Sequence, residues 1–214
     1  MYDDRAQAGR ELARSLAGYA HRADVMVLGL PRGGVPVAAE VARVLVAPLD
    51  VFVVRKLGVP GHRELAMGAI ASGGIRVMND PVLRAAGISE EAVERVAAEE
   101  GAELRRREEI YRGERPPLSL TGRVVILVDD GLATGASMRA AVEAARRYEP
   151  ARVVVAVPVA PAQSVRELGT IADEVVCCST PADFTAVGSH YRDFRETTDD
   201  EVRALLHGDG GSPG

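Results

Sequence analysis

Residues 124–137 read Val-Val-Ile-Leu-Val-Asp-Asp-Gly-Leu-Ala-Thr-Gly-Ala-Ser, and they are the strongest indication of the fold class. Its five leading residues are apolar and mostly β-branched, which predicts a strand buried on both faces, as in a parallel sheet. Asp129 and Asp130 come directly after that strand. Because ligands of open α/β sheets bind at the carboxyl ends of the strands, we expect the two acids at a binding site.

The loop after the two acids is built from small residues and leads into a helix that we expect to start at Ser137. Its backbone N–H groups are free of bulky side chains and the helix dipole adds positive charge, so the loop suits an anion. Carboxylates suit sugar hydroxyls, so the two features together indicate a phosphorylated sugar. The alternative is an ordinary turn before an N-capped helix. It accounts for Gly131 and Ser137 but leaves two adjacent acids without a local neutralising partner.

This order of apolar strand, Asp-Asp pair and small-x-Thr-Gly-x-Ser loop resembles the signature of type I phosphoribosyltransferases, which bind 5-phosphoribosyl 1-diphosphate (PRPP). The resemblance implies that Asp129 and Asp130 face the 2′- and 3′-hydroxyls of the ribose and take part in binding Mg²⁺. It also implies a loop that wraps the 5′-phosphate. The residues of that loop are Ala133, Thr134, Gly135, Ala136 and Ser137.

The composition is that of a globular α/β protein. The 214 residues are 47% hydrophobic and 27% charged, with a net charge of −5, and the isoelectric point is about 5.5. An acidic chain argues against general nucleic-acid binding, which needs a basic face. The first residues include Asp3 and Asp4 where a leader would be apolar, and no apolar run approaches the ~20 residues of a membrane helix. We therefore expect a cytoplasmic protein that binds neither nucleic acid nor membrane.

Strands and helices alternate along the chain, which predicts a doubly wound, mostly parallel sheet flanked by helices, as in type I phosphoribosyltransferases. We expect a single domain over residues 1–206 with an inserted loop and helical arm at about 57–115, and a disordered tail at 207–214. Residues 57–74 are Gly-rich and predict a mobile loop or a hairpin. The expected strands are 25–30, 49–54, 75–78, 123–128, 153–158 and 174–178, and the expected helices are 3–22, 35–45, 89–112, 136–148, 161–168 and 199–206.

A second glycine-containing loop, Pro31-Arg32-Gly33-Gly34, follows the first predicted strand. Its bare amides suit an anion, and the guanidinium of Arg32 offers forked donors that match phosphate oxygens. In the family that the chain resembles, this loop holds the diphosphate of PRPP. A plain strand-to-helix turn is the alternative interpretation.

Arg55 and Lys56 follow the second predicted strand, and Lys56 is the single lysine among 26 basic residues. A lysine kept in so arginine-rich a chain indicates a need for a compact, rotatable charge, although a surface cation retained by chance is the alternative. The pair and the loop that follows it resemble the catalytic loop region of orotate phosphoribosyltransferase. By that resemblance, Arg55 and Lys56 bind diphosphate oxygens, and His62 lies on a loop that closes over the reaction.

The acceptor is not evident from the sequence. In hypoxanthine-guanine enzymes of the family an acid of the phosphate loop assists the purine, and here that position is Ala133, which counts against a 6-oxopurine. Tyr191, within the aromatic segment 183–195, is a candidate for stacking on a base or nucleotide. Packing of these aromatic residues on the core explains the segment equally well.

The sequence leaves two functions open. The first is a Mg²⁺-dependent transferase that moves the phosphoribosyl group of PRPP to a nitrogenous base and releases pyrophosphate. The second is a regulatory protein of the same fold that senses PRPP or a nucleotide without turnover. Family members are often dimers, so we expect a homodimer.

Overall fold

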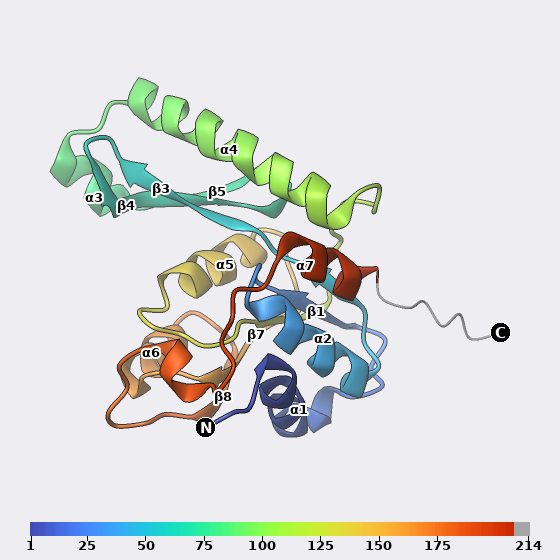
Figure 1. The fold of residues 1–214 in the computed structure, drawn as a ribbon. Helices are drawn as coiled ribbons and strands as arrows, with labels where there is room; N and C mark the ends of the chain where they lie inside the picture. The colour runs from blue at the N-terminus through green and yellow to red at the C-terminus, as the bar shows by residue number, and fades with distance from the viewer. Residues whose placement is uncertain (208–214) are drawn as a thin grey trace.

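The fold is a five-stranded parallel sheet with an antiparallel arm above it, in a computed structural model that describes residues 1–207 (Figure 1). The order of the parallel strands is β2-β1-β6-β7-β8, and every neighbouring pair is parallel. The predicted α/β fold class is therefore confirmed. The parallel strands are β1 (Val25–Gly29), β2 (Leu49–Val51), β6 (Val124–Val128), β7 (Arg152–Val159) and β8 (Glu174–Ser179).

Helices cover both faces of the parallel sheet. Successive side chains of a strand point to opposite faces, and in β6 all five residues are buried. Ile126 belongs to the core under α1 (Arg5–Ser15) and α2 (Gly34–Leu45), whereas Leu127 belongs to the core under α5 (Ala136–Arg146) and α6 (Ala162–Leu168). Burial on both sides explains why the β6 sequence is continuously apolar.

The strand order reverses between β1 and β6, because the chain runs outward to β2 on one side and through β6, β7 and β8 on the other. Such a switch point opens a crevice at the carboxyl ends of the two strands, where ligands bind. Gly29 and Val128 are paired at those ends. The two loops singled out in the sequence therefore leave the sheet side by side.

The first helix is shorter than predicted. It starts at Arg5, because the Asp4 side chain accepts a hydrogen bond from the Gln7 N–H and caps the helix, and it ends at Ser15. A 3₁₀ turn, Ala17–Tyr19, takes up much of the remainder of the predicted range 3–22. Gly18 lies in this turn, and glycine has a low helix propensity.

The arm, residues 54–112, consists of a three-stranded antiparallel sheet with two helices. Its strands are β3 (Val54–Val59), β4 (His62–Ala71) and β5 (Ile75–Met78), and its helices are α3 (Asp80–Ala86) and α4 (Glu90–Arg112). The predicted strand 49–54 is thus confirmed only over Leu49–Val51, because β2 ends at Val51 and β3 belongs to a different sheet. Of the two possibilities for residues 57–74, the hairpin is confirmed for 57–71 and is followed by a 3₁₀ turn, Ser72–Gly74.

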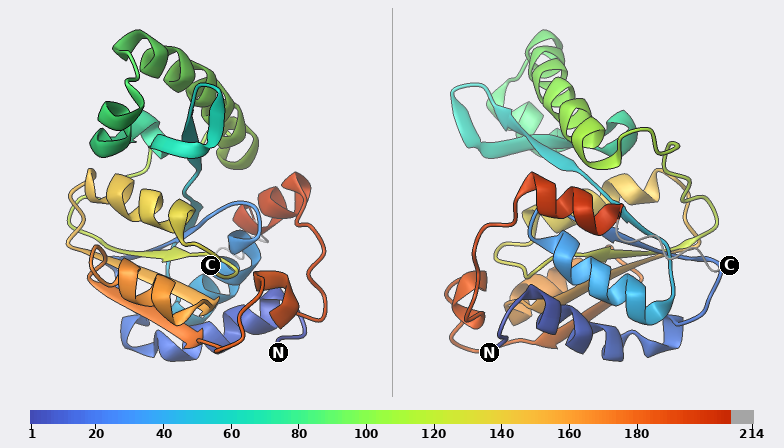
Figure 2. Two further views of the ribbon diagram at one scale, coloured as in Figure 1. Left: turned by 90° about the vertical axis from the view of Figure 1, so that its left-hand side faces the viewer. Right: turned by 45° about the vertical axis from the view of Figure 1, so that its right-hand side comes forward.

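Helix α7 (Asp199–Leu206) lies between the arm and α2 (Figure 2). It packs into one apolar cluster with β3, β4 and α4, in which Leu57, Leu104 and Val202 are each at most 1% exposed. At the base of the arm, the guanidinium of Arg112 pairs with the carboxylate of Asp50 at 3.0 Å, and both residues are buried. The C-terminal segment therefore connects the arm with the core.

Of the predicted disordered tail, residues 208–214 lie outside the described residues. Within residues 1–207, no helix combines the length and the apolar character needed to cross a lipid bilayer.

Candidate functional site

The two predicted loops form one site at the switch point. Gly34 lies so close to the end of β6 that a Cβ atom on it would be 2.7 Å from the Val128 carbonyl oxygen. A Cβ atom on Gly33 would be 2.1 Å from Oδ2 of Asp130. Glycine is thus required at both positions for the β1–α2 loop to contact the paired acids. The peptide between Pro31 and Arg32 in this loop is cis.

Asp129 and Asp130 are held at the end of β6 by local and long-range contacts. The Asp130 N–H donates to Oδ1 of Asp129 at 2.9 Å. Burial raises the pKa of Asp129 well above its ordinary value, and the adjacent charge of Asp130 raises it further. Burial also raises the pKa of Asp130, while a hydrogen bond from Arg5 acts in the opposite direction. Two full negative charges are therefore costly here unless a cation compensates them.

Arg5 supplies that cation, and sequence reasoning missed it. Its Nε donates to Oδ2 of Asp130 at 2.8 Å, with the two side chains 11% and 13% exposed. No residue close to the acids in the sequence neutralises them, as expected. Arg5 instead comes from α1, near the N-terminus of the chain. No motif marks this arginine, because the contact depends on how α1 packs across the sheet.

The phosphate loop has the backbone geometry expected of an anion site. Gly135 has a φ of 73°, in the left-handed region that favours glycine, and α5 begins directly after it at Ala136, the first residue of the predicted range 136–148. The hydroxyl of Ser164 donates to the carbonyl oxygen of Ala133 at 2.9 Å and holds the loop against α6. The first-turn amides of an 11-residue helix are then available to an anion.

Lys56 and the phosphate loop line the same cavity, which has a volume of about 570 Å³ and lies between the arm and α5. The cavity contacts Thr134, Ala136 and Ser137 on one side and Lys56 on the other. The Lys56 ammonium is 3.5 Å from Glu64 and half-exposed. Arg139, in the first turns of α5, adds a second cation to the cavity and was not expected from the sequence.

Arg55 and Lys56 are neighbours within β3, so their side chains leave opposite faces of the antiparallel sheet. The Arg55 guanidinium is 2.6 Å from the carboxylate of Glu100 on α4. His62 begins β4 and is exposed at the end of the hairpin, where it is paired with Val59. Of the three predicted catalytic residues of this segment, the structure brings Lys56 to the phosphate loop.

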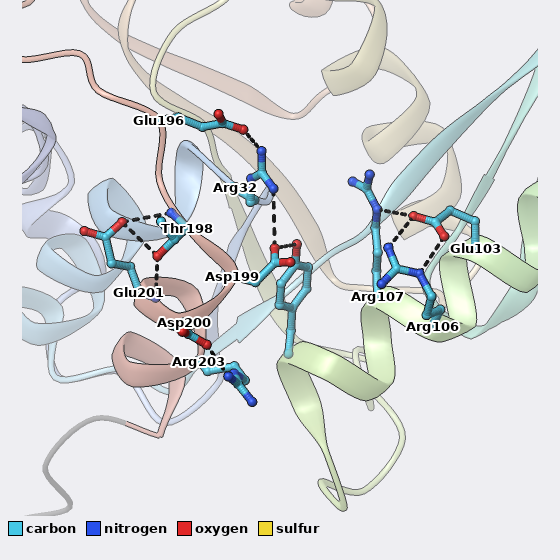
Figure 3. A network of polar contacts seen from close by, with 11 residues as sticks. Arg32, Glu103, Arg106, Arg107, Glu196, Thr198, Asp199, Asp200, Glu201 and Arg203 are labelled. Atoms are coloured by element: carbon cyan, nitrogen blue, oxygen red, sulfur yellow. Dashed lines mark hydrogen bonds and ion pairs between the residues drawn. The ribbon is translucent and has the colours of Figure 1, made fainter.

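Arg32 is turned toward the C-terminal segment. Its guanidinium pairs with Glu196 and lies 3.6 Å from Asp199, which also accepts a hydrogen bond from Tyr111 of α4 at 2.7 Å (Figure 3). The same view shows Glu103 of α4 bound by two arginines of its own helix. Arg32, which the sequence predicts to bind the diphosphate, is therefore paired with acidic side chains in this structure.

Tyr191 is buried and contacts the backbone of the paired acids. It is 6% exposed, packs against Tyr2 with ring centroids 5.4 Å apart, and donates from its hydroxyl to the Asp130 carbonyl oxygen at 2.5 Å. Burial raises the pKa of Tyr191, so the hydroxyl remains a donor. This arrangement corresponds to the alternative in which the aromatic segment packs on the core. Phe194, 5.1 Å from the Tyr191 ring, is more exposed.

Comparison with known proteins identifies the family. Residues 1–193 match the family described as "Phosphoribosyl transferase domain". Two Mycobacterium tuberculosis relatives, MT0597 and Rv0571c, carry the provisional name phosphoribosyl transferase. Each is 53% identical to this chain over 206 residues. The match covers 96% of this chain and 46% of the relative. The chain thus spans about half the length of these curated relatives.

Solved structures share the fold of this chain. The crystal structure of TT1426 from Thermus thermophilus is 51% identical with a TM-score of 0.86, and the match covers 96% of this chain and 97% of that one. A Neisseria gonorrhoeae protein with bound ppGpp is 16% identical with a TM-score of 0.52, over 97% and 93% of the two chains, and shares the fold alone.

Proposed function

This chain belongs to the phosphoribosyl transferase domain family, and on that premise we propose that it transfers the 5-phosphoribosyl group of PRPP to a nitrogenous acceptor, with release of pyrophosphate. The observation that carries the proposal is the contact between the paired acids and two glycine-containing loops at one switch point. Gly33 contacts Asp130, and the phosphate loop begins three residues after Asp130, at Ala133. A sugar with a phosphate on each side fits this arrangement.

The reaction would be a displacement at C1 of the ribose. The bond from C1 to the diphosphate oxygen breaks, a bond from C1 to the acceptor nitrogen forms, and the nitrogen loses its proton to solvent or a base. Positive charge develops on the sugar ring as the diphosphate leaves. Asp129 and Asp130 would anchor the hydroxyls and stabilise that charge, while Arg32 and Lys56 would neutralise the leaving group.

The carboxylates of Asp129 and Asp130 are oxygen ligands of the kind that Mg²⁺ prefers, so they would be the residues that hold the ion. Among residues 1–207 there is no group of three or more side chains suited to hold a metal, and Mg²⁺ is typically held by one or two carboxylates together with substrate phosphates. Asp129 and Asp130 would hold it jointly with the oxygens of PRPP. When bound, the ion would neutralise charge on the diphosphate.

One observation favours the second function, a sensor that binds PRPP without turnover. Two of the arginines that the sequence suggests for the diphosphate are paired with acidic side chains of the protein, Arg32 with Glu196 and Arg55 with Glu100. A ligand would have to compete with these acids or leave them in place. Binding could then occur at the sugar and phosphate without the leaving group being fully neutralised.

The test is pyrophosphate release from PRPP and Mg²⁺ across a panel of nitrogenous bases. If the protein is an enzyme, we expect turnover with at least one base. Asp130→Asn and Lys56→Ala should each abolish that turnover. Arg14→Gln, which removes an exposed charge from α1, is the matched control and should retain turnover. PRPP binding by calorimetry without release of pyrophosphate would favour the sensor, and absence of PRPP binding would refute both functions.

A further inference from the structure

Arg5 makes three contacts that meet at the proposed ribose site. Its Nε donates to Oδ2 of Asp130 at 2.8 Å, and its Nη1 donates to the carbonyl oxygen of Arg195 at 2.7 Å. The guanidinium carbon lies 4.0 Å from the centre of the Phe194 ring. One planar side chain thus joins α1, the end of β6 and the C-terminal segment, and 11% of it is exposed.

These contacts restrict the Asp130 side chain at one of its two oxygens. Arg5 binds Oδ2, and Gly33 lies close to the same oxygen, since a Cβ atom there would be 2.1 Å from Oδ2 and 3.4 Å from Nε of Arg5. A guanidinium that donates to a carboxylate and stacks on a ring is itself held in one orientation. The carboxylate is therefore held against the β1–α2 loop before any ligand binds.

The second carboxylate oxygen of Asp130 remains for a ligand. Within residues 1–207 the hydrogen bonds to this side chain involve Oδ2 alone, so Oδ1 accepts none. Arg32, the guanidinium of the neighbouring loop, is directed to Glu196 instead. Arg5 is the one basic residue paired with either acid in the described part of the chain.

We propose that Arg5 is a positioning residue of the ribose site: it binds Oδ2 of Asp130 and thereby directs Oδ1 toward a ribose hydroxyl. The inference rests on the proposed function, because it assumes that the paired acids bind the sugar. An acid oriented in advance loses less conformational freedom when the sugar binds, so Arg5 strengthens binding without touching the substrate. Its effect should be confined to ligands that carry the ring hydroxyls.

Dependence on the ring hydroxyls distinguishes a positioning role of Arg5 from a purely structural one. Calorimetry would compare ribose 5-phosphate with 2-deoxyribose 5-phosphate and 3-deoxyribose 5-phosphate, which keep the phosphate and lose one hydroxyl. The wild-type protein should prefer ribose 5-phosphate to at least one deoxy analogue by about tenfold or more, the value of a hydrogen bond to a charged group. Arg5→Gln should reduce that preference to about threefold or less, because Asp130 loses its orientation.

Three further variants complete the comparison. Arg14→Gln removes an exposed arginine from the same helix and should keep the wild-type preference. Arg5→Lys keeps the charge without the forked geometry and should give an intermediate preference. If Arg5→Gln does not fold, Phe194→Leu removes the stacking partner of Arg5, leaves the acids untouched, and should lower the preference by about twofold to fivefold.

The outcomes decide between the two proposals. An unchanged preference in Arg5→Gln, or equal weakening of all three ligands, overturns the positioning role and leaves the proposed function standing. A wild-type protein that binds the ligands without any preference overturns it as well. If the wild-type protein binds neither PRPP nor ribose 5-phosphate, the proposed function fails and the inference fails with it.

Discussion

Substitution of Gly33 by alanine should disrupt the proposed site with little effect on folding. The new Cβ atom would lie 2.1 Å from Oδ2 and 2.8 Å from Cγ of Asp130, whereas Cβ atoms in proteins essentially never approach another heavy atom closer than 3.0 Å. The carboxylate must then move by roughly 1 Å. The backbone need not change, because Gly33 has φ −62° and ψ −31°, which alanine adopts readily.

The expected loss is large in binding and small in stability. A misplacement of about 1 Å in a binding group can cost on the order of 10²-fold in activity, and the moved carboxylate also loses its alignment with Arg5. We expect PRPP to bind Gly33→Ala at least about tenfold more weakly. The midpoint of thermal unfolding should stay within a few degrees of the wild type, because a side chain, and not the backbone, gives way.

Two other glycines provide the comparison. At Gly34 the added Cβ atom would meet backbone atoms, 2.7 Å from the Val128 carbonyl oxygen and 2.9 Å from Cα of Asp129. Overpacking of this kind costs about 1–3 kcal/mol of unfolding free energy. At Gly18 a Cβ atom meets nothing within 4 Å, so Gly18→Ala should match the wild type in both assays. Wild-type PRPP affinity in a folded Gly33→Ala protein would refute the reasoning.

Three further predictions concern the C-terminal segment and the arm. Glu196→Gln should free Arg32 and tighten binding of inorganic pyrophosphate by about twofold to fivefold, the range of an exposed ion pair; calorimetry that shows no gain would contradict a competing role for Glu196. Asp50→Asn should lower the unfolding free energy in urea by about 3–5 kcal/mol, because it leaves the buried charge of Arg112 unpaired, and a loss below about 1 kcal/mol would count against that. Burial raises the pKa of Tyr111 to about 12, so the contribution of its protonated hydroxyl to the unfolding free energy is complete below pH 10 and declines as the pH rises toward 12. When unfolding free energy is measured at increasing alkaline pH, Tyr111→Phe should lose less of it than the wild type. Equal losses would exclude this contribution.

Local sequence sufficed for the parallel sheet and for the two loops at its switch point. A strand buried on both faces has to be continuously apolar, so β6 could be recognised from residues 124–128 alone. The glycines of the β1–α2 loop and the small residues before α5 are likewise local requirements of backbone that approaches a ligand. Predictions for these segments needed no knowledge of distant contacts.

The arm was harder to predict, because its strands contain charged residues and glycines and are not continuously apolar. The sequence pattern put Arg55 and Lys56 at the end of a core strand, yet they lie inside β3, where the alternation of side chains sends one to Glu100 and the other to the cavity. That division depends on which sheet the strand joins. A one-residue shift in the register of β3 would exchange the two roles.

By itself, the amino-acid sequence determined the fold class, the family resemblance and the candidates for binding sugar and phosphate, because each rests on a short pattern of burial, backbone freedom and charge. Only the tertiary structure decided which charges meet. Arg5 reaches Asp130, and Arg32 reaches Glu196, across more than a hundred residues of chain. Such pairs arise from the packing of α1 and the C-terminal segment on the sheet, and no local pattern in the sequence encodes that geometry.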